Sequence, residues 1–366
     1  MTRSPARTRL LAVGAAAALV LAACSSSKTS SGSSGGASAP SKIPISTIGS
    51  YLTIFSPLWA AEPDLDAVAQ KFHTKFSYQP FSKGGDALTA LLGGSVQMAA
   101  GASAAQALKA AAQGKKLSYV ANIFSGGGVV LVGAKKYESE RGTDLAKYAG
   151  GSWGYTSEGS SSQLFMQASA EHAGLNWDKQ KHVALGGVAA YEPSLQSGRA
   201  DIVSMDSGAA AKSVQDGIGY VVLNTNDATQ FDPIAGKVLD NGLIFTNSFR
   251  QKYPQLVEAI VTAFIKGLLK VRAVTDPNQA YDLLPATFQK AHPDKAQFAV
   301  EWQLSQPAFA QTDGSSSADA IANTSKISLK PDQIDSEGVK QLYDNSLVDA
   351  AYKSLNVPRP TLPAGN

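Results

Sequence analysis

The chain has 366 residues, a formal net charge of +3, 44% hydrophobic residues and a single cysteine. Three of its 32 basic residues, Arg3, Arg7 and Arg9, lie in the first 24 positions, and the rest of the chain carries 29 basic and 29 acidic residues. A neutral body without a Lys/Arg-rich run argues against nucleic acid or an anionic membrane surface as a partner, and one cysteine excludes an intrachain disulfide.

The N-terminus has the pattern of a bacterial lipoprotein. Residues 1–23 combine basic residues with an uncharged apolar run that is short for a membrane span, which predicts a signal peptide. The sequence Leu21-Ala22-Ala23-Cys24 resembles the lipobox, so we expect Cys24 to be lipidated, with palmitate as an acyl chain. A plain signal peptide with a chance cysteine is the alternative. Residues 24–41 are rich in Ser, Gly and Ala and predict a flexible tether.

The globular part is expected to begin with a strand at 43–48, a helix at 58–72 and a second strand at 76–81. Five aromatic residues could either line a pocket for a flat ring or fill the core, and both interpretations stay open. They are Tyr51, Phe55, Phe81, Phe124 and Tyr155.

Residues 83–132 switch repeatedly between helical and strand periodicity. Helical spacing near 88–92 gives way to alternation at 96–100, returns at 104–111, and is followed by strands at 117–124 and 129–132. This order predicts β-α-β crossovers and a mostly parallel sheet. Ligands bind beyond the carboxyl ends of such strands, so Gly84, Gly85 and residues 101–103 are candidates for a pocket floor. Capping and turn formation alone are the alternative interpretation.

The same pattern recurs between 186 and 224. Residues 94–99 align with 198–203, and Ala102-Ser103-Ala104 align with Asp206-Ser207-Gly208, with a drift of one residue over the unit. The repeat predicts two similar α/β lobes with a cleft between them that suits a small ligand.

Between the two units, a strand at 153–155 precedes a long helix that starts after 156–163. Hydroxyl residues and a glycine at this helix start could present donors to an accepting ligand group, or could serve only as caps. Glu158 argues against a very acidic ligand there. After a turn-rich passage at 224–237, a strand at 238–245 and a set of core-forming helices complete the chain.

A set of short motifs in this order carries a family resemblance. They are residues 91–97, 110–114, 126–132, 151–154 with 159–163, 195–201 and 249–254. The chain resembles the solute-binding lipoproteins of ABC importers, in the group for sulfonates, nitrate and taurine that also includes binders of thiamine-precursor pyrimidines.

The resemblance implies an α/β fold of the periplasmic-binding-protein type II, with two lobes, each a mostly parallel sheet flanked by helices, joined by two crossing strands. It implies a first lobe formed by 42–133 and 232–366 and a second lobe at 134–231, with crossings near 132–135 and 223–231.

The resemblance also implies where a ligand is held. The implied ligand-binding residues are Ser50, Tyr51, Gly84, Gly85, Ala102, Ser103, Ser125, Ser157, Gly159, Ser160 and Ser161. Asp206 is added because it stands where the family often has Trp-Glu-Pro, and a carboxylate there would repel an anion and accept N–H donors.

We therefore expect a monomeric, lipid-anchored receptor on the outer face of the bacterial cytoplasmic membrane, which delivers a small molecule to an ABC permease and its ATPase. No cofactor, metal or catalysis is expected, since His73, His172, His182 and His292 lack metal-site spacing. A pyrimidine-synthesis-like enzyme on the same fold and an adhesin or signalling lipoprotein are the alternatives. The ligand stays open among sulfonate, nitrate, aromatic acid, pyrimidine and amine.

Overall fold

The computed structural model describes residues 38–362. The predicted signal peptide, Cys24 and the tether up to residue 37 lie outside the described residues. Within 38–362, no helix combines the length and the apolar character needed to cross a bilayer.

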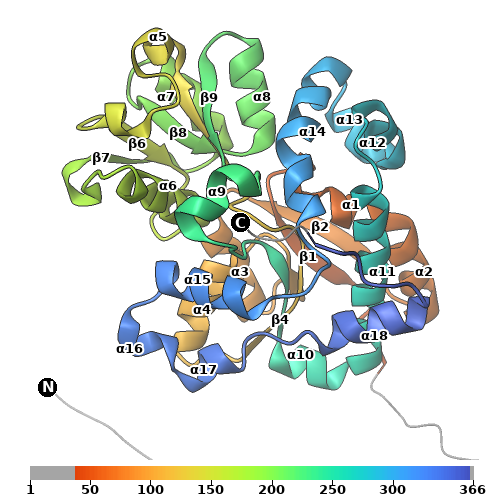
Figure 1. The fold of residues 1–366 in the computed structure, drawn as a ribbon. Coiled ribbons are helices and arrows are strands. Elements are labelled where there is room, and N and C mark those ends of the chain that lie inside the picture. Colours follow the sequence, from red (N-terminus) through yellow and green to blue (C-terminus); the bar gives the residue numbers. More distant parts are fainter. Residues whose placement is uncertain (1–37, 363–366) are drawn as a thin grey trace, which may run out of the picture. The chain divides into compact units, whose positions relative to one another are not determined.

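The first lobe is built on a five-stranded sheet in the order β2-β1-β3-β10-β4 (Figure 1). Its strands are β1 (Ile43–Ile48), β2 (Phe76–Phe81), β3 (Met98–Ala99), β4 (Leu117–Asn122) and β10 (Gly242–Thr246). Strand β1 pairs in parallel with β2 and β3, whereas β10 is antiparallel to both β3 and β4. Four strands therefore run one way and one runs the other, so the predicted mostly parallel sheet is confirmed.

Helices cover both faces of this sheet. Successive residues of β10 point to opposite faces, and accordingly Leu243 and Phe245 join one hydrophobic cluster and Ile244 joins another. The first cluster packs mainly on α1 (Ser56–Ala60), α2 (Glu62–Phe72), α11 (Pro254–Arg272), α12 (Pro277–Leu283), α13 (Ala286–Ala291), α14 (Lys295–Ala310) and α18 (Ser346–Leu355). The second packs mainly on α3 (Gly84–Leu92), α4 (Ala104–Ala112), α15 (Ala318–Ser328) and α17 (Glu337–Lys340). The remaining elements of this lobe are η1 (Thr53–Phe55), α10 (Asn247–Lys252) and α16 (Pro331–Ile334).

The second lobe repeats this plan with the strand order β7-β6-β8-β5-β9. Its strands are β5 (Val130–Ala134), β6 (Ser152–Tyr155), β7 (Lys181–Ala184), β8 (Ile202–Met205) and β9 (Gly219–Asn224). Here β5 is the one antiparallel strand. The flanking helices are η2 (Lys135–Tyr137), α5 (Glu138–Arg141), η3 (Leu145–Tyr148), α6 (Ser161–His172), η4 (Trp177–Lys179), η5 (Val188–Ala190), α7 (Tyr191–Gln196), α8 (Ser207–Gln215) and α9 (Ala228–Ala235).

The two predicted units occupy equivalent places in the two sheets. Strand β3 leads into α4, and β8 leads into α8, at the third position of each strand order. Ser103 is the N-cap of α4 and Asp206 is the N-cap of α8. Ser103 is therefore structurally equivalent to Asp206. The sequence alignment paired Ser103 with Ser207 instead, so the two pairings differ by one residue.

Two segments connect the sheets: 123–129 between β4 and β5, and 225–241 between β9 and β10. All of β5 pairs with β8 and β9 of the second sheet, so the predicted lobe boundary between 133 and 134 falls inside a strand of the second lobe. The predicted crossing near 132–135 likewise lies within β5 and the first residue of the 3-10 helix that follows it.

Local differences from the expected elements have simple causes. The helix predicted at 58–72 is two helices, because Pro63 stands in the first turn of α2 and has no N–H to continue the first helix. The strand predicted at 238–245 begins only at Gly242, and Leu239 forms an isolated bridge with Ser125 instead.

The late helix α14 packs against α8 of the second lobe, as Figure 1 shows in blue and green. Two side-chain amides of the second lobe, those of Asn224 and Asn226, each donate to the carbonyl of Leu304 over 3.0 Å. The C-terminal third of the chain thus contributes to contacts between the lobes.

Candidate functional site

A hollow of about 620 Å³, including its opening to solvent, lies between the two lobes. It is lined by Ile48, Leu52, Ile54, Phe55, Gly84, Gly101, Ser103, Gln106, Phe124, Gly128, Val129, Thr156, Ser160, Ser161, Ser162, Val188, Tyr191, Asp206, Asp240 and Asn241. The N-terminal ends of α3 and α4 in the first lobe and of α6 and α8 in the second meet here. The hollow therefore lies at the carboxyl ends of the strands that precede these helices, where α/β folds bind ligands.

Five predicted site residues line the hollow: Gly84, Ser103, Ser160, Ser161 and Asp206. Ser103 and Ser160 come from different lobes and face the same space, so the structure brings together the two helix starts that the sequence singled out.

The other seven predicted site residues are not among those that line the hollow. They are Ser50, Tyr51, Gly85, Ala102, Ser125, Ser157 and Gly159. Ser50 is exposed in the turn after β1, and the Tyr51 ring packs on Trp59 with a centroid distance of 5.0 Å. Ala102 is fully buried, and Ser125 lines a separate cavity beside Gly126. The strand ends are correctly placed, but the direction of each side chain depends on turn geometry that periodicity does not reveal.

On the first-lobe side, Ser103 and Gln106 form a capping box at the start of α4. The Ser103 hydroxyl accepts from the Gln106 N–H at 3.3 Å, and the Ser103 N–H donates to Oε1 of Gln106 at 3.1 Å. This pairing holds the Gln106 side chain across the floor of the hollow. A Cβ on Gly84 would lie 2.4 Å from Gln106 Oε1, so any other residue at this position would displace the end of the Gln106 side chain.

On the second-lobe side, a chain of hydroxyl groups surrounds the start of α6. Ser160 caps the helix and its Oγ lies 2.8 Å from that of Ser162. Ser162 Oγ donates to Thr156 Oγ1 over 3.1 Å, and Thr156 Oγ1 lies 2.7 Å from the hydroxyl of Tyr191. The network fixes these groups as a preorganised polar wall, since each hydroxyl already has a partner.

Asp206 caps α8 with one carboxylate oxygen and leaves the other without a partner. Its Oδ1 accepts from the N–H groups of Gly208 and Ala209 at 3.0 and 3.1 Å. Its Oδ2 is covered from solvent and has no hydrogen-bond partner among the described residues. Burial and the nearby charge of Glu301 raise the pKa of Asp206, although its hydrogen bond from Ala209 acts to lower it.

A second carboxyl group, Asp240, reaches the hollow from the segment before β10. Its residue surface is 2% exposed, and its Oδ1 has no hydrogen-bond partner within 38–362. Burial raises the pKa of Asp240 well above its ordinary value of 3.8, although a hydrogen bond with the Ser161 side chain acts to lower it. Because Ser161 belongs to α6, this bond joins the two lobes at the hollow.

The apolar side of the hollow comes mostly from the first lobe. Phe55 and Phe124 meet edge to face with a centroid distance of 6.2 Å. Of the five aromatic residues considered from the sequence, these two line the hollow, whereas Tyr51, Phe81 and Tyr155 do not. Tyr155 instead hydrogen-bonds Glu158.

A buried ion pair lies behind Asp206. Glu301 is 1% exposed, accepts from Thr53 at 2.6 Å and from Gln297 at 2.7 Å, and has His292 Nε2 at 3.3 Å. Burial acts to raise the pKa of Glu301, but the bonds to His292 and Thr53 outweigh it, so the pKa is lowered. Burial acts to lower the pKa of His292, but Glu301 outweighs it, so that pKa is raised. Each residue of the pair therefore favours the charged form of the other.

Sequence reasoning missed several lining residues, chief among them Gln106, Asp240, Asn241, Thr156 and Tyr191. Gln106 was detectable, since Ser-x-x-Gln before an apolar helix is a capping-box signature. Asp240 and Asn241 precede a strand rather than follow one, so the strand-end rule passes over them.

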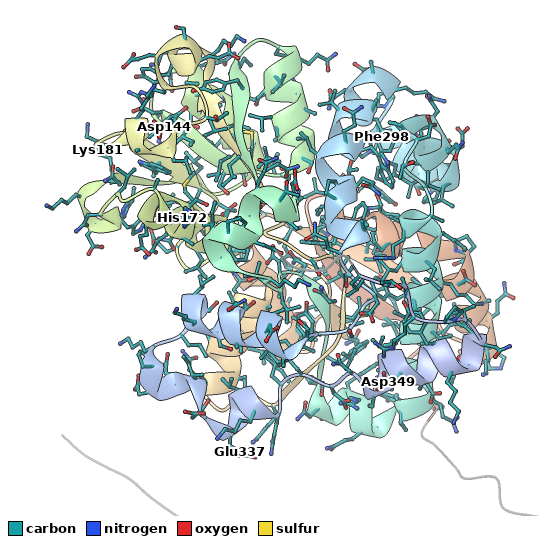
Figure 2. The ribbon with its side chains drawn as sticks, in the orientation of Figure 1. Asp144, His172, Lys181, Phe298, Glu337 and Asp349 are labelled. Atoms are coloured by element: carbon teal, nitrogen blue, oxygen red, sulfur yellow. The ribbon has the colours of Figure 1, made fainter. Side chains whose placement is uncertain are left out.

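Among residues 38–362, no group of three or more His, Cys, Asp or Glu side chains is arranged to hold a metal ion. The described histidines have structural surroundings instead. His182 stacks on Trp177, His292 pairs with Glu301, His73 ends α2, and His172 is exposed at the end of α6 (Figure 2).

Comparison with known families gives a match over residues 76–280 to the family described as NMT1/THI5 like. The chain belongs to the NMT1/THI5-like family. The predicted resemblance is confirmed at this level. No protein of curated function matches this chain.

Solved structures share the fold of this NMT1/THI5-like protein at low sequence identity. A Bordetella bronchiseptica protein has a TM-score of 0.70 at 20% identity, covering 87% of this chain and 98% of its own. The alkanesulfonate-binding protein SsuA of Xanthomonas axonopodis, bound to MOPS, has a TM-score of 0.61 at 18% identity over 85% and 98%. The periplasmic nitrate-binding protein NrtA of Synechocystis has 0.64 at 12% over 88% and 92%. The predicted two-lobed periplasmic-binding-protein fold is thereby confirmed.

The Asp240→Asn variant tests the buried carboxyl group. A carboxyl group whose pKa is raised by folding stabilises the native state below its unfolded pKa, and that stability is lost as pH rises toward the native pKa. We expect the free energy of unfolding of Asp240→Asn to equal that of the wild type near pH 4. Near pH 8 we expect it to be higher by about 1 to 3 kcal/mol, because the wild type then buries a carboxylate with too few hydrogen-bond partners. Denaturant unfolding across this pH range measures the difference. A difference that does not change with pH would contradict the assignment.

Proposed function

We propose that this protein is a solute-binding receptor that holds a small molecule between its lobes and delivers it to an ABC importer. The observation that supports the proposal most strongly is that both lobes contribute helix starts and polar side chains to one shared hollow. Family membership and the fold shared with ABC-type binding proteins support the same conclusion. We propose binding without catalysis, by a monomer whose partners are the small molecule, the permease and its ATPase.

Ligand capture would operate through closure of the lobes. Each lobe has its own hydrophobic clusters, and only the segments 123–129 and 225–241 connect the sheets. Such an arrangement permits a hinge, and a ligand favours the closed state to the extent that it contacts both lobes at once. The interaction between Asp240 and Ser161, which belong to opposite sides of the hollow, is a contact that closure would favour.

Two exposed valines of the second lobe give a matched test of the hollow as the binding site. Val188 is 37% exposed and lines the hollow, whereas Val214 is 40% exposed on α8 and does not. We expect Val188→Trp to weaken binding at least tenfold by obstructing the hollow, and Val214→Trp to bind as the wild type does. Thermal shift against sulfonates, aromatic acids, pyrimidines and amines identifies a ligand for the titration, since saturation at 100 times Kd stabilises by about 2.7 kcal/mol.

Both variants should melt at the wild-type temperature without ligand, because neither side chain is buried. The proposal fails if no compound in the four classes shifts the wild-type melting temperature, or if Val188→Trp binds as tightly as Val214→Trp.

We further propose that the receptor is held on the outer face of the cytoplasmic membrane through Cys24, with the following Ser/Gly-rich segment as a tether. The sequence pattern of residues 1–41 supports this part of the proposal. We expect Cys24→Ser to move the protein from the membrane fraction to the soluble fraction and to abolish incorporation of labelled palmitate. Membrane retention of the unlabelled variant would show that another feature anchors the chain.

A further inference from the structure

The charged residues that line the hollow all have the same sign. They are Asp206 and Asp240, and no Lys, Arg or His is among the lining residues in the described part of the chain. Lys109 approaches the neighbouring loop, where its Nζ would lie 3.2 Å from a Cβ on Gly159, but it does not line the hollow. The hollow therefore contains two acidic groups and no matching base.

Each of the two carboxyl groups has one oxygen left over. Asp206 uses Oδ1 for the cap of α8, and its Oδ2 is covered and unpartnered. Asp240 is 2% exposed and bonds to Ser161, and its Oδ1 is covered and unpartnered. A covered carboxylate oxygen without a donor costs free energy, so both oxygens favour an incoming hydrogen-bond donor.

The third acid near the hollow does not need such a partner. Glu301 has Thr53 and Gln297 as hydrogen-bond donors and His292 as its ion-pair partner. Its charge raises the pKa of Asp206 without supplying a donor to it. Among the described residues that line the hollow, only Asp206 and Asp240 therefore have a covered carboxyl oxygen that lacks a hydrogen-bond donor.

Several backbone N–H groups at the helix starts around the hollow already have hydrogen-bond acceptors within the protein and are not free to bind an anion. In α4 the N–H of Ala104 donates to the Asp240 carbonyl at 2.7 Å, and that of Gln106 donates to Ser103. In α8 the N–H groups of Gly208 and Ala209 donate to Asp206. Four of the backbone donors at the starts of α4 and α8 are therefore already engaged by the protein's own oxygens, which leaves fewer of them for a sulfonate or nitrate.

From this geometry we infer that the ligand carries a positively charged nitrogen with N–H donors, as in an amine or amidinium, which Asp206 Oδ2 and Asp240 Oδ1 accept from opposite lobes. The apolar or aromatic part of the ligand packs on Phe55 and Phe124. This inference rests on the proposed receptor function and defines its substrate class. A cation that contacts both lobes at once would also stabilise the closed state relative to the open state.

Four probes of similar shape and different charge test the inference. Benzamidine is a cation with N–H donors, benzamide is neutral, and benzoate and benzenesulfonate are anions. Their binding to the full-length protein, purified in detergent, is measured by thermal shift and calorimetry, with phenethylamine and agmatine as cations of other lengths. We expect at least one cation to raise the melting temperature by several degrees and the two anions to leave it unchanged.

Asp206→Asn and Asp240→Asn should each weaken the binding of that cation at least tenfold. Asp276→Asn is the matched control, because Asp276 caps α12 through two N–H groups as Asp206 caps α8, but lies outside the hollow. Asparagine is a good N-cap, so α8 and α12 are preserved in Asp206→Asn and Asp276→Asn, whereas Asp240 precedes a strand and caps no helix of the described chain.

The outcomes separate this inference from the receptor proposal. Stabilisation by an anion that Val188→Trp abolishes would keep the receptor and overturn the cationic class. Cation binding that both Asp→Asn variants retain would also overturn the inference. If none of the cations binds, the inference fails, and if nothing in the wider four-class screen binds either, the receptor proposal fails with it.

Discussion

Two carboxyl groups at the junction of the lobes, each with one oxygen that is covered from solvent and unpartnered, are the constraint on which the site depends. A buried carboxylate needs donors, and the protein supplies them to only one oxygen of Asp206 and to Asp240 only through Ser161. In a medium of low polarity such an arrangement favours either the protonated acid or a bound cation. The electrostatic character of the hollow follows from these two residues more than from the hydroxyl groups around them.

The fold explains why both groups reach one place. In each lobe the strand at the third position of the sheet is followed by a helix, and the residue just before that helix caps it. The first lobe has Ser103 at this position and the second has Asp206, so the two lobes are equivalent in backbone and different in charge. Asp240 lies on the returning segment, where its carbonyl accepts the first N–H of α4 and its side chain meets α6. The two lobes therefore contribute one carboxyl group each, Asp240 and Asp206, to opposite sides of the hollow.

Much of this arrangement could be predicted from the sequence, because it depends on local periodicity. The repeat at 83–132 and 186–224 placed the helix starts at Ser103 and Asp206, and the hydroxyl-rich helix start at 156–163 placed Ser160 and Ser161. What could not be predicted depends on side-chain direction and on long-range return of the chain. Tyr51 follows the correct strand but turns onto Trp59, and Asp240 is brought to the hollow only because β10 inserts between β3 and β4. No local pattern around residue 240 records that insertion.

The most direct test of this account is a crystal structure of the protein with the strongest-binding compound from the probe series. The account predicts a ligand nitrogen within hydrogen-bonding distance of both Asp206 Oδ2 and Asp240 Oδ1, with the lobes closed and the apolar part of the ligand against Phe55 and Phe124. A ligand bound through an anionic group to the starts of α4 and α6, with both carboxyl groups left unpartnered, would contradict it.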